Sequence, residues 1–179
     1  MPSNQKVLVA SSLHPWDDPR IFYKQCHSLN KFYKITLIAV AEKKSFQINN
    51  IQVIGLTKPT SIINRLKNGL KIIKELFYGK YAILHFHDPE LLPAGLALRR
   101  LGKKVIYDAH ELLPASLRSK PYLSRPARWI TALVIGQYER FVAKRLSAVV
   151  AATPVIANRL RKVQSRTVVV ANFPELAEY

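Results

Sequence analysis

Apolar stretches of strand length alternate with helical patterns along almost the whole chain. The strand-like stretches are residues 7–10, 34–40, 51–54, 81–86, 104–107, 148–151 and 167–170. The helical patterns are residues 20–30, 61–78, 90–101, a long one within 126–145, and 154–162. Because the strands are apolar throughout and are separated by helices, the pattern predicts a parallel sheet with crossover helices on both faces. The expected fold class is α/β, a Rossmann-like doubly wound sheet.

Several predicted helix boundaries carry local signals. Three helices begin with a capping side chain followed by proline, at Asp18-Pro19, Asp88-Pro89 and Thr153-Pro154. Aspartate and threonine accept hydrogen bonds from the first turn, and proline fits there because its missing N–H has no partner to lose. Gly102 stands where a helix end favours a left-handed residue. Pro93 lies inside the third helix and predicts an irregular first turn.

Composition narrows the class of protein. A chain of 179 residues with 49% hydrophobic content is expected to form one domain with a sizeable core. Lys and Arg number 28 against 11 Asp and Glu, and the resulting charge of +17 points to anionic partners: nucleotide phosphates, nucleic acid or an acidic membrane surface. Cys26 is the only cysteine, so no internal disulfide can form and a reducing compartment is expected.

The sequence shows no pattern of export or membrane insertion. The first twelve residues have too short an apolar core for a signal peptide. The longest uncharged apolar stretch, residues 129–136, is well short of the roughly 20 residues that a spanning helix needs. We therefore expect a cytoplasmic protein.

Two polar clusters follow neighbouring strands of the predicted sheet. Residues 81–93 read YAILHFHDPELLP, and His85 and His87 should point to the same side of the strand because they are two residues apart. The next strand ends in Asp108, His110 and Glu111. Since ligand crevices of open α/β sheets lie at the carboxyl ends of strands, we expect the two clusters to converge on a functional site.

A metal site is the alternative interpretation of these clusters. Two histidines and a carboxylate are a common ligand set for zinc or iron, so His85/His87/Asp88 with Asp108/His110 would suit a metal-dependent hydrolase. No H-E-x-x-H or C-x-x-C spacing accompanies them. We favour the plainer interpretation, in which no metal binds and His85 hydrogen-bonds a neighbouring loop.

The turn after the first strand, residues 11–20, contains no glycine. Dinucleotide-binding turns and phosphate loops need glycines for close backbone approach to phosphate, so no nucleotide is expected at this turn. His14, Trp16 and Asp17 are polar or aromatic. They predict one wall of a polar pocket, with the indole as a face for stacking a sugar, or else a packed surface loop.

Four motifs, taken in order, resemble those of one enzyme family. They are His14 with Asp18-x-Arg20-Ile21, His85-x-His87-Asp88-Pro89-Glu90-Leu91, Asp108-x-His110-Glu111 and Asn172-Phe173-Pro174. On this βα alternation they resemble the N-terminal half of family-4 glycosyltransferases with the GT-B fold. The resemblance implies that residues 1–171 are the N-terminal, acceptor-side Rossmann-like domain and that residues 172–179 begin the linker to a second domain. The C-terminal nucleotide-sugar domain is then expected in a longer enzyme.

The resemblance also implies a chemistry. A retaining glycosyltransferase transfers a sugar from a nucleotide-sugar donor, bound by the other domain, to a saccharide or lipid-linked acceptor, with no cofactor in this domain. His87 and His110 are then the candidate catalytic residues, expected to contact the acceptor or the transferred sugar and not to act as a base. The other expected substrate contacts are His14, Trp16, Asp18, Arg20, Asp88, Asp108 and Glu111. Many relatives carry paired glycines near the donor phosphates where this chain has Ser11-Ser12-Leu13-His14.

Residues 61–78 predict a membrane-facing helix. Their apolar side chains fall on one arc, as a helix that covers a sheet requires: Ile62, Ile63, Leu66, Leu70, Ile73, Leu76 and Phe77. Lys67, Lys71 and Lys74 flank that arc, which suits anionic lipid head groups or, equally, a solvated basic face. We expect a peripheral enzyme of polysaccharide or glycolipid assembly at the inner face of a membrane. A basic nucleic-acid-binding module is the remaining alternative, but no reading motif is present, so no specific nucleic acid is expected.

Overall fold

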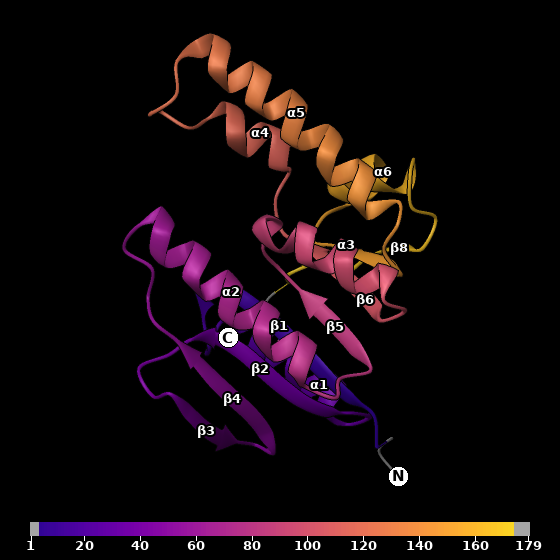
Figure 1. Ribbon diagram of the computed structural model, residues 1–179. Helices are drawn as coiled ribbons and strands as arrows, with labels where there is room; N and C mark the ends of the chain where they lie inside the picture. Colours follow the sequence, from indigo (N-terminus) through magenta and orange to yellow (C-terminus); the bar gives the residue numbers. More distant parts are fainter. Residues whose placement is uncertain (1–3, 174–179) are drawn as a thin grey trace.

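A central sheet of eight strands organises the computed structural model, which describes residues 4–173 (Figure 1). In spatial order the strands are β3 (Ser45–Ile48), β4 (Ile51–Leu56), β2 (Lys34–Val40), β1 (Lys6–Pro15), β5 (Ile83–Phe86), β6 (Lys104–Ala109), β7 (Ala148–Ala151) and β8 (Thr167–Val169). Neighbouring strands are parallel, except that β3 pairs antiparallel with β4. The predicted parallel sheet is confirmed.

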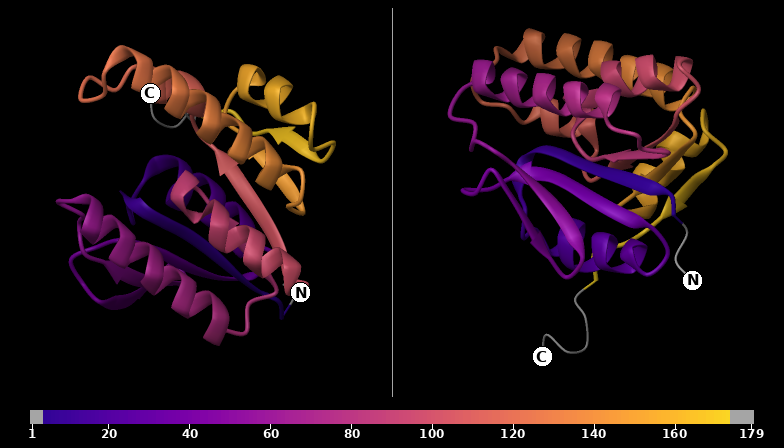
Figure 2. Two further views of the ribbon diagram at one scale, coloured as in Figure 1. Left: turned by 45° about the horizontal axis from the view of Figure 1, so that its top comes forward. Right: turned by 60° about the horizontal axis from the view of Figure 1, so that its bottom comes forward.

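Helices lie on both faces of the sheet. They are η1 (Pro19–Cys26, a π-helix), α1 (His27–Asn30), α2 (Ile62–Tyr78), η2 (Pro89–Leu91, a 3-10 helix), α3 (Leu92–Arg100), α4 (Leu113–Arg118), α5 (Arg125–Ala143) and α6 (Pro154–Arg161). In the right view of Figure 2, α2 and α5 lie above the sheet and η1 with α1 lies below it. The chain runs outward from β1 to β2 and β4, returns to β5 beside β1, and continues the other way to β8. This winding is the doubly wound, Rossmann-like arrangement that the sequence predicts.

The side chains of each strand alternate between two core layers. In β1, Leu8 and Ala10 belong to the layer under α2 and α3, which continues to α5 and α6. Val7 and Val9 belong to the second layer, where Phe22 of η1 is fully buried. The apolar strands predicted from the sequence are therefore covered on both sides around β1, as a parallel sheet requires.

Two elements escaped the sequence pattern. Strand β3 has only four residues, none of them fully buried, so it does not stand out as an apolar stretch. It joins β4 through Asn49 and Asn50, whose φ angles of 50° and 62° match the left-handed turn that favours asparagine in tight hairpins. Helix α4 has six residues, too few to show a helical period.

The helix boundary signals gave mixed results. Asp18 accepts hydrogen bonds from the N–H groups of Arg20 and Ile21, and Thr153 caps α6, so both predicted caps are confirmed. Gly102 has the expected left-handed φ of 81°. Pro93 falls in the first turn of α3, preceded by the short η2, which confirms the irregular start. The prediction for Asp88 was wrong in one respect, because its side chain makes no cap and binds the N–H of Ser12 instead.

The apolar arc of α2 faces the sheet only in part, because Leu76 is buried in the core and several other members point outward. Its members Ile63, Leu66, Leu70 and Phe77 are between 51% and 66% exposed. The buried face of α2 is formed by Leu76 of this arc together with Asn68, Gly69 and Ile72. Asn68 reaches the strand ends, where its amide donates to the carbonyls of Ser12 and Thr57. None of the helices within residues 4–173 is long and apolar enough to cross a bilayer.

Candidate active site at the ends of β1, β5 and β6

The direction of winding changes between β1 and β5, and a cluster of ionisable side chains lies at this point. His85 pairs in register with Val9 and points, like Val9, to the η1 side of the sheet. His87 follows on the same side, with the two ring centroids 4.9 Å apart. Asp108 and His110 come from the end of β6, the neighbouring strand. The predicted convergence of the two clusters is therefore confirmed.

Asp108 is fully buried at the centre of the cluster. Its carboxylate accepts hydrogen bonds from Nη2 of Arg20, at 3.0 and 3.3 Å, and from Nε2 of Gln25. Arg20 and Gln25 are five residues apart on η1, and the i to i+5 winding of a π-helix brings them to the same side. Nη1 of Arg20 also donates to the carbonyl of Val170, at 2.6 Å. Arg20 thus joins η1, β6 and the segment after β8.

Four imidazoles form a row from the surface to Asp108, in the order His14, His110, His87 and His85. The ring centroids of His14 and His110 are 5.4 Å apart, and those of His110 and His87 are 4.9 Å apart. Nδ1 of His87 lies 2.7 Å from Nε2 of His110, a hydrogen bond in which one ring donates and the other accepts. The side chains of His14 and His110 are 35% and 21% exposed, whereas that of His87 is completely covered. A substrate can therefore reach His14 and His110, and His87 lies behind His110.

The pKa values of His87 and His110 are lowered from the usual value of histidine. Burial lowers the pKa of His87, and the neighbouring His85 adds to this effect, while Asp108 opposes it. Burial also lowers the pKa of His110, again against the charge of Asp108. Burial by itself raises the pKa of Asp108, but the contact with His85 and the charges of the other imidazoles hold that pKa well below its usual range. At neutral pH, His87 and His110 are therefore neutral rings beside the Asp108 carboxylate.

His14 differs from the other rings of the row. Its Nδ1 lies 3.2 Å from Oδ2 of Asp18, and this contact raises the pKa of His14 against the effect of burial. Burial raises the pKa of Asp18, but the contact with His14 and the N–H group of Ile21 reverse this and leave it lowered. The backbone N–H of His14 donates to Oγ of Ser11, which keeps the end of β1 folded toward the row. The sequence motif of His14 with Asp18 therefore has a direct structural basis.

Asp88 and Glu90 form a separate hydrogen-bonded group with Ser12 at the end of β1. Oδ2 of Asp88 accepts the N–H of Ser12 at 2.6 Å, and Oε1 of Glu90 accepts the hydroxyl of Ser12 at 2.6 Å. Arg65 of α2 binds both carboxylate oxygens of Glu90. Burial and the charge of Glu90 raise the pKa of Asp88. These hydrogen bonds hold the turn that carries His14 in place. The sequence analysis did not predict this role for Ser12, Glu90 and Arg65.

Besides Asp88, the predicted site residues Trp16 and Glu111 do not join the cluster. The indole of Trp16 packs edge-on against Phe22 and Phe46, with ring centroids 5.2 and 5.1 Å apart, as part of the second core layer. Glu111 is exposed, and its charge acts on Glu139 of α5. A contact of Trp16 with a sugar thus has no support from this arrangement. Gln25, which the sequence reasoning passed over, binds Asp108 and could have been found only from the winding of η1.

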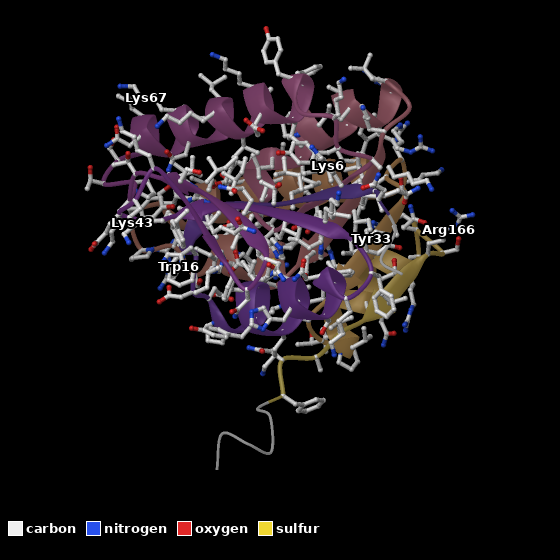
Figure 3. All side chains as sticks on the ribbon, turned by 90° about the horizontal axis from the view of Figure 1, so that it is seen from below. Lys6, Trp16, Tyr33, Lys43, Lys67 and Arg166 are labelled. Carbon is white, nitrogen blue, oxygen red and sulfur yellow. The ribbon has the colours of Figure 1, made fainter. Side chains whose placement is uncertain are left out.

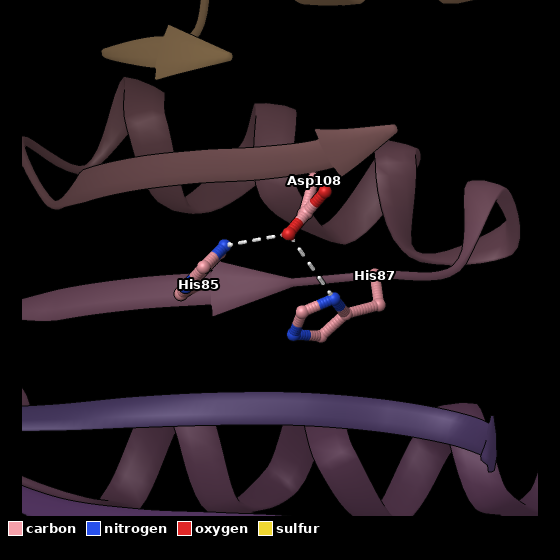
Figure 4. Close-up of side chains that lie close together, drawn as sticks. All are labelled: His85, His87 and Asp108. Carbon is pink, nitrogen blue, oxygen red and sulfur yellow. Dashed lines mark ion pairs between the residues drawn. The ribbon is translucent and has the colours of Figure 1, made fainter. Parts of the chain in front are cut away.

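His85, His87 and Asp108 form the one group of possible metal ligands within residues 4–173, with ligand atoms within 4.8 Å of one another (Figure 4). His85 and His87 each lie 3.7 Å from Oδ2 of Asp108. The carboxylate is Asp108 and not Asp88, which faces Ser12. Because Arg20 and Gln25 already bind Asp108, a cation would have to displace a buried guanidinium. The donor set fits a metal poorly. The expected loop partner of His85 was also wrong, since its Nε2 faces Asp108.

A large open hollow lies at the opposite ends of the strands. It measures about 730 Å³ and is lined by Lys6, Tyr33, Ser45, Gln52 and other residues near the starts of β1, β2 and β3. Lys6 and Tyr33 are labelled in Figure 3. No histidine or aspartate lines this hollow, whereas Asp108 lies at the other edge of the sheet.

Comparison with known families decides the class of the chain. Residues 20–177 match the family model described as Glycosyltransferase Family 4. The chain belongs to this family of glycosyltransferases. The matched range includes Arg20, both histidine clusters and most of the fold. No curated protein matches the chain.

Solved structures with the same fold are GT-B glycosyltransferases. Sucrose-phosphate synthase from Thermosynechococcus elongatus has 13% identity and a TM-score of 0.69, with 97% of this chain and 49% of that chain covered. Anabaena Alr3699/HepE in complex with UDP and glucose has 12% identity and a TM-score of 0.59, with 98% of this chain and 46% of that chain covered. Trehalose 6-phosphate synthase from Burkholderia multivorans has 12% identity and a TM-score of 0.53, with 90% of this chain and 43% of that chain covered. The chain thus spans about half the length of the enzymes that it resembles.

Proposed function

We propose that this chain is the acceptor-side half of a two-domain glycosyltransferase that transfers a sugar from a nucleotide-sugar donor with retention of configuration. The observation that carries the proposal is the partly exposed His110, hydrogen-bonded to the buried His87, at the carboxyl edge of β6 in a family-4 chain. Sugar nucleotides suit the family, because the Anabaena relative is described with UDP and glucose. In this account the nucleotide binds a second domain that follows residues 172–179, of which 174–179 lie outside the described part.

In this proposal His110 contacts the reacting groups of the substrates. If Nε2 of His110 accepts from His87, its Nδ1 carries the remaining proton and can donate to a hydroxyl or phosphate oxygen of the substrates. A neutral ring does this without adding charge, and the lowered pKa keeps the ring neutral at physiological pH. His110 therefore orients substrate and stabilises developing charge, which are the tasks expected of the protein in a retaining transfer.

His87, Asp108 and Arg20 are positioning residues in this account. The covered ring of His87 holds His110 at 2.7 Å, and Asp108 lies 3.6 Å from Nε2 of His110. Arg20 pairs with Asp108 and is buried, so its guanidinium is covered from the surface, although its Nε has no hydrogen-bond partner. His14 and Asp18 form the exposed rim beside His110 and are the second pair expected to contact the acceptor.

The acceptor in this proposal is a saccharide or lipid-linked saccharide presented at the inner face of a membrane. Support comes from α2, whose lysines Lys67, Lys71 and Lys74 are all exposed beside its outward apolar arc. Figure 3 shows Lys67 on the outer side of α2. Each basic residue near an anionic membrane surface contributes about 1 kcal/mol to the free energy of binding, and this contribution decreases as the salt concentration rises.

The test is the stereochemistry of transfer by the natural-length protein that carries this segment. The protein is incubated with a panel of α-linked UDP- and GDP-sugars and a membrane glycolipid extract, and release of nucleoside diphosphate identifies the donor. The anomeric configuration of the new linkage is then read by proton NMR. An α-linked product is expected, and a β-linked product would exclude retention. Zinc-dependent hydrolysis of the donor without transfer would favour the hydrolase alternative.

A further inference from the structure

Helix α5 exposes an apolar stripe that the rest of the described chain covers only in part. Trp129, Ile130, Leu133 and Val134 are 63%, 64%, 64% and 57% exposed. Their spacing of i, i+1, i+4 and i+5 places them on one side of the helix. Ala132 and Gly136, which border this side of the helix next to Pro114 of α4, are buried. The helix therefore packs through its small residues and presents its large apolar residues outward.

The surroundings of this stripe are positively charged. The guanidinium of Arg118, on α4, lies over the indole of Trp129 at 4.6 Å from the ring centroid, a cation–π contact. Arg125, at the start of α5, is exposed. Glu139 is the only acid between positions 112 and 145, and it is buried and bound to Arg159. The stripe thus combines large apolar side chains with cations and no exposed acid.

Helix α2 repeats this combination on the same side of the sheet. Its outward residues Leu66, Leu70 and Phe77 are exposed beside Lys67 and Lys71. In Figure 1 both α2 and α5 lie in front of the sheet and run in roughly the same direction. Two helices of one layer therefore expose apolar residues flanked by cations.

We propose that the outward stripe of α5 is a second membrane-docking element, which inserts Trp129 and its apolar neighbours among the head groups of an anionic phospholipid bilayer. The proposal rests on the membrane location in the proposed function and names the surface responsible. Apolar residues beside arginine and lysine are the pattern of helices that lie in a bilayer interface. Tryptophan favours that level because its ring is amphipathic. Arg118, held against the indole, is in place to bind a lipid phosphate.

Fluorescence gives a direct test, because the chain has two tryptophans. In a Trp16→Phe variant, Trp129 is the only tryptophan in residues 1–179. Vesicles of phosphatidylcholine with phosphatidylglycerol should shift its emission to shorter wavelength, and lipids brominated near the head group should quench it. Pure phosphatidylcholine vesicles should do neither at low salt. Absence of shift and quenching, with the protein bound to the anionic vesicles, would overturn the proposal.

Sedimentation with the same vesicles separates α5 from α2. The double variant Trp129→Ser/Leu133→Ser should lower the partition coefficient at least about tenfold, since apolar burial and charge act together in interfacial binding. The matched control is Phe32→Ser/Val155→Ser, which removes two apolar side chains that are 62% and 64% exposed elsewhere. This control should bind like the wild type. Circular dichroism melts confirm that each variant is folded, as expected for exposed positions.

The outcomes distinguish this proposal from the one on which it rests. If Lys67→Glu/Lys71→Glu/Lys74→Glu abolishes binding and the α5 variant binds normally, membrane location stands and the α5 proposal is wrong. If the wild type binds no anionic vesicle, both are wrong. The wild type is also tested without lipid for a dimer whose amount rises with protein concentration. If the α5 variant loses this dimer but binds vesicles as the wild type does, the stripe is an interface between two copies of the chain, and the lipid proposal is wrong.

Discussion

Nδ1 of His87 lies 2.7 Å from Nε2 of His110, and only the second of these rings is accessible to solvent. This pair joins the buried part of the site, centred on Asp108, to the exposed part formed by His110 and His14. A substrate contact at His110 is therefore held by groups that no substrate touches. The relationship also explains why two successive strands end in histidine.

The pH dependence of stability should differ in sign between His110 and His14. The pKa of His110 is lowered in the folded state, so the unfolded chain binds its proton first and stability falls as pH drops below about 6.5. The pKa of His14 is raised, so its contribution is complete below about pH 6.5 and is lost as pH rises through the folded value. Relative to wild type, His110→Gln should gain stability toward acid pH, and His14→Gln should lose it. Urea unfolding between about pH 5 and pH 8 measures both. Parallel slopes for the two variants would contradict the assigned shifts.

Removal of Arg20 should destabilise the fold strongly. Arg20→Ala leaves the Asp108 carboxylate buried without its guanidinium, and breaking a buried pair typically costs about 3–5 kcal/mol. The matched control is Arg65→Ala, which breaks the more exposed pair with Glu90 and should cost no more than about 1 kcal/mol. Chemical denaturation gives both free energies of unfolding. Equal losses in the two variants would show that Arg20 does not carry the charge balance of the site.

Chelation should leave the protein unchanged. Because Arg20 and Gln25 bind Asp108, the group of His85, His87 and Asp108 offers no free carboxylate oxygen pair to a cation. After dialysis against EDTA, the melting temperature and any sugar transfer by the natural-length protein should equal those before dialysis. Stoichiometric zinc or iron by mass spectrometry, with activity restored only by that metal, would instead establish the hydrolase alternative.

Nucleotide binding should require more than residues 1–179. The turn after β1 has no glycine, and its Ser11 and Ser12 are fully buried, with Ser12 bound to Asp88 and Glu90. Calorimetric titration of the isolated chain with UDP, GDP and ADP should give little heat, and the natural-length protein should bind one of the three. Tight, base-selective binding by the isolated chain would refute the assignment of the donor to a second domain.

The sequence predicted the sheet because its strands are uniformly apolar and its helices start with recognisable caps. It predicted the convergence of His87 and His110 because parallel strands end at a common edge. It could not predict which residues of the α2 arc are buried, because the spacing of apolar residues is the same for a helix that faces a core and for one that faces an interface. Nor could it predict the partners of Asp108, because the side on which Gln25 lies depends on the π-helical winding of η1.

The most direct test of the account is the turnover of the natural-length protein after His110→Ala. Loss of a hydrogen bond made in the transition state commonly costs about 10²-fold or more, and His110 is exposed enough for its removal to leave the fold intact. The matched control is His27→Ala, the one histidine of the chain outside the imidazole row. We predict a loss of about 10²-fold or more in turnover for His110→Ala, with the melting temperature and the control close to wild type. Normal turnover by His110→Ala, or an equal loss in His27→Ala, would contradict the assignment of this site.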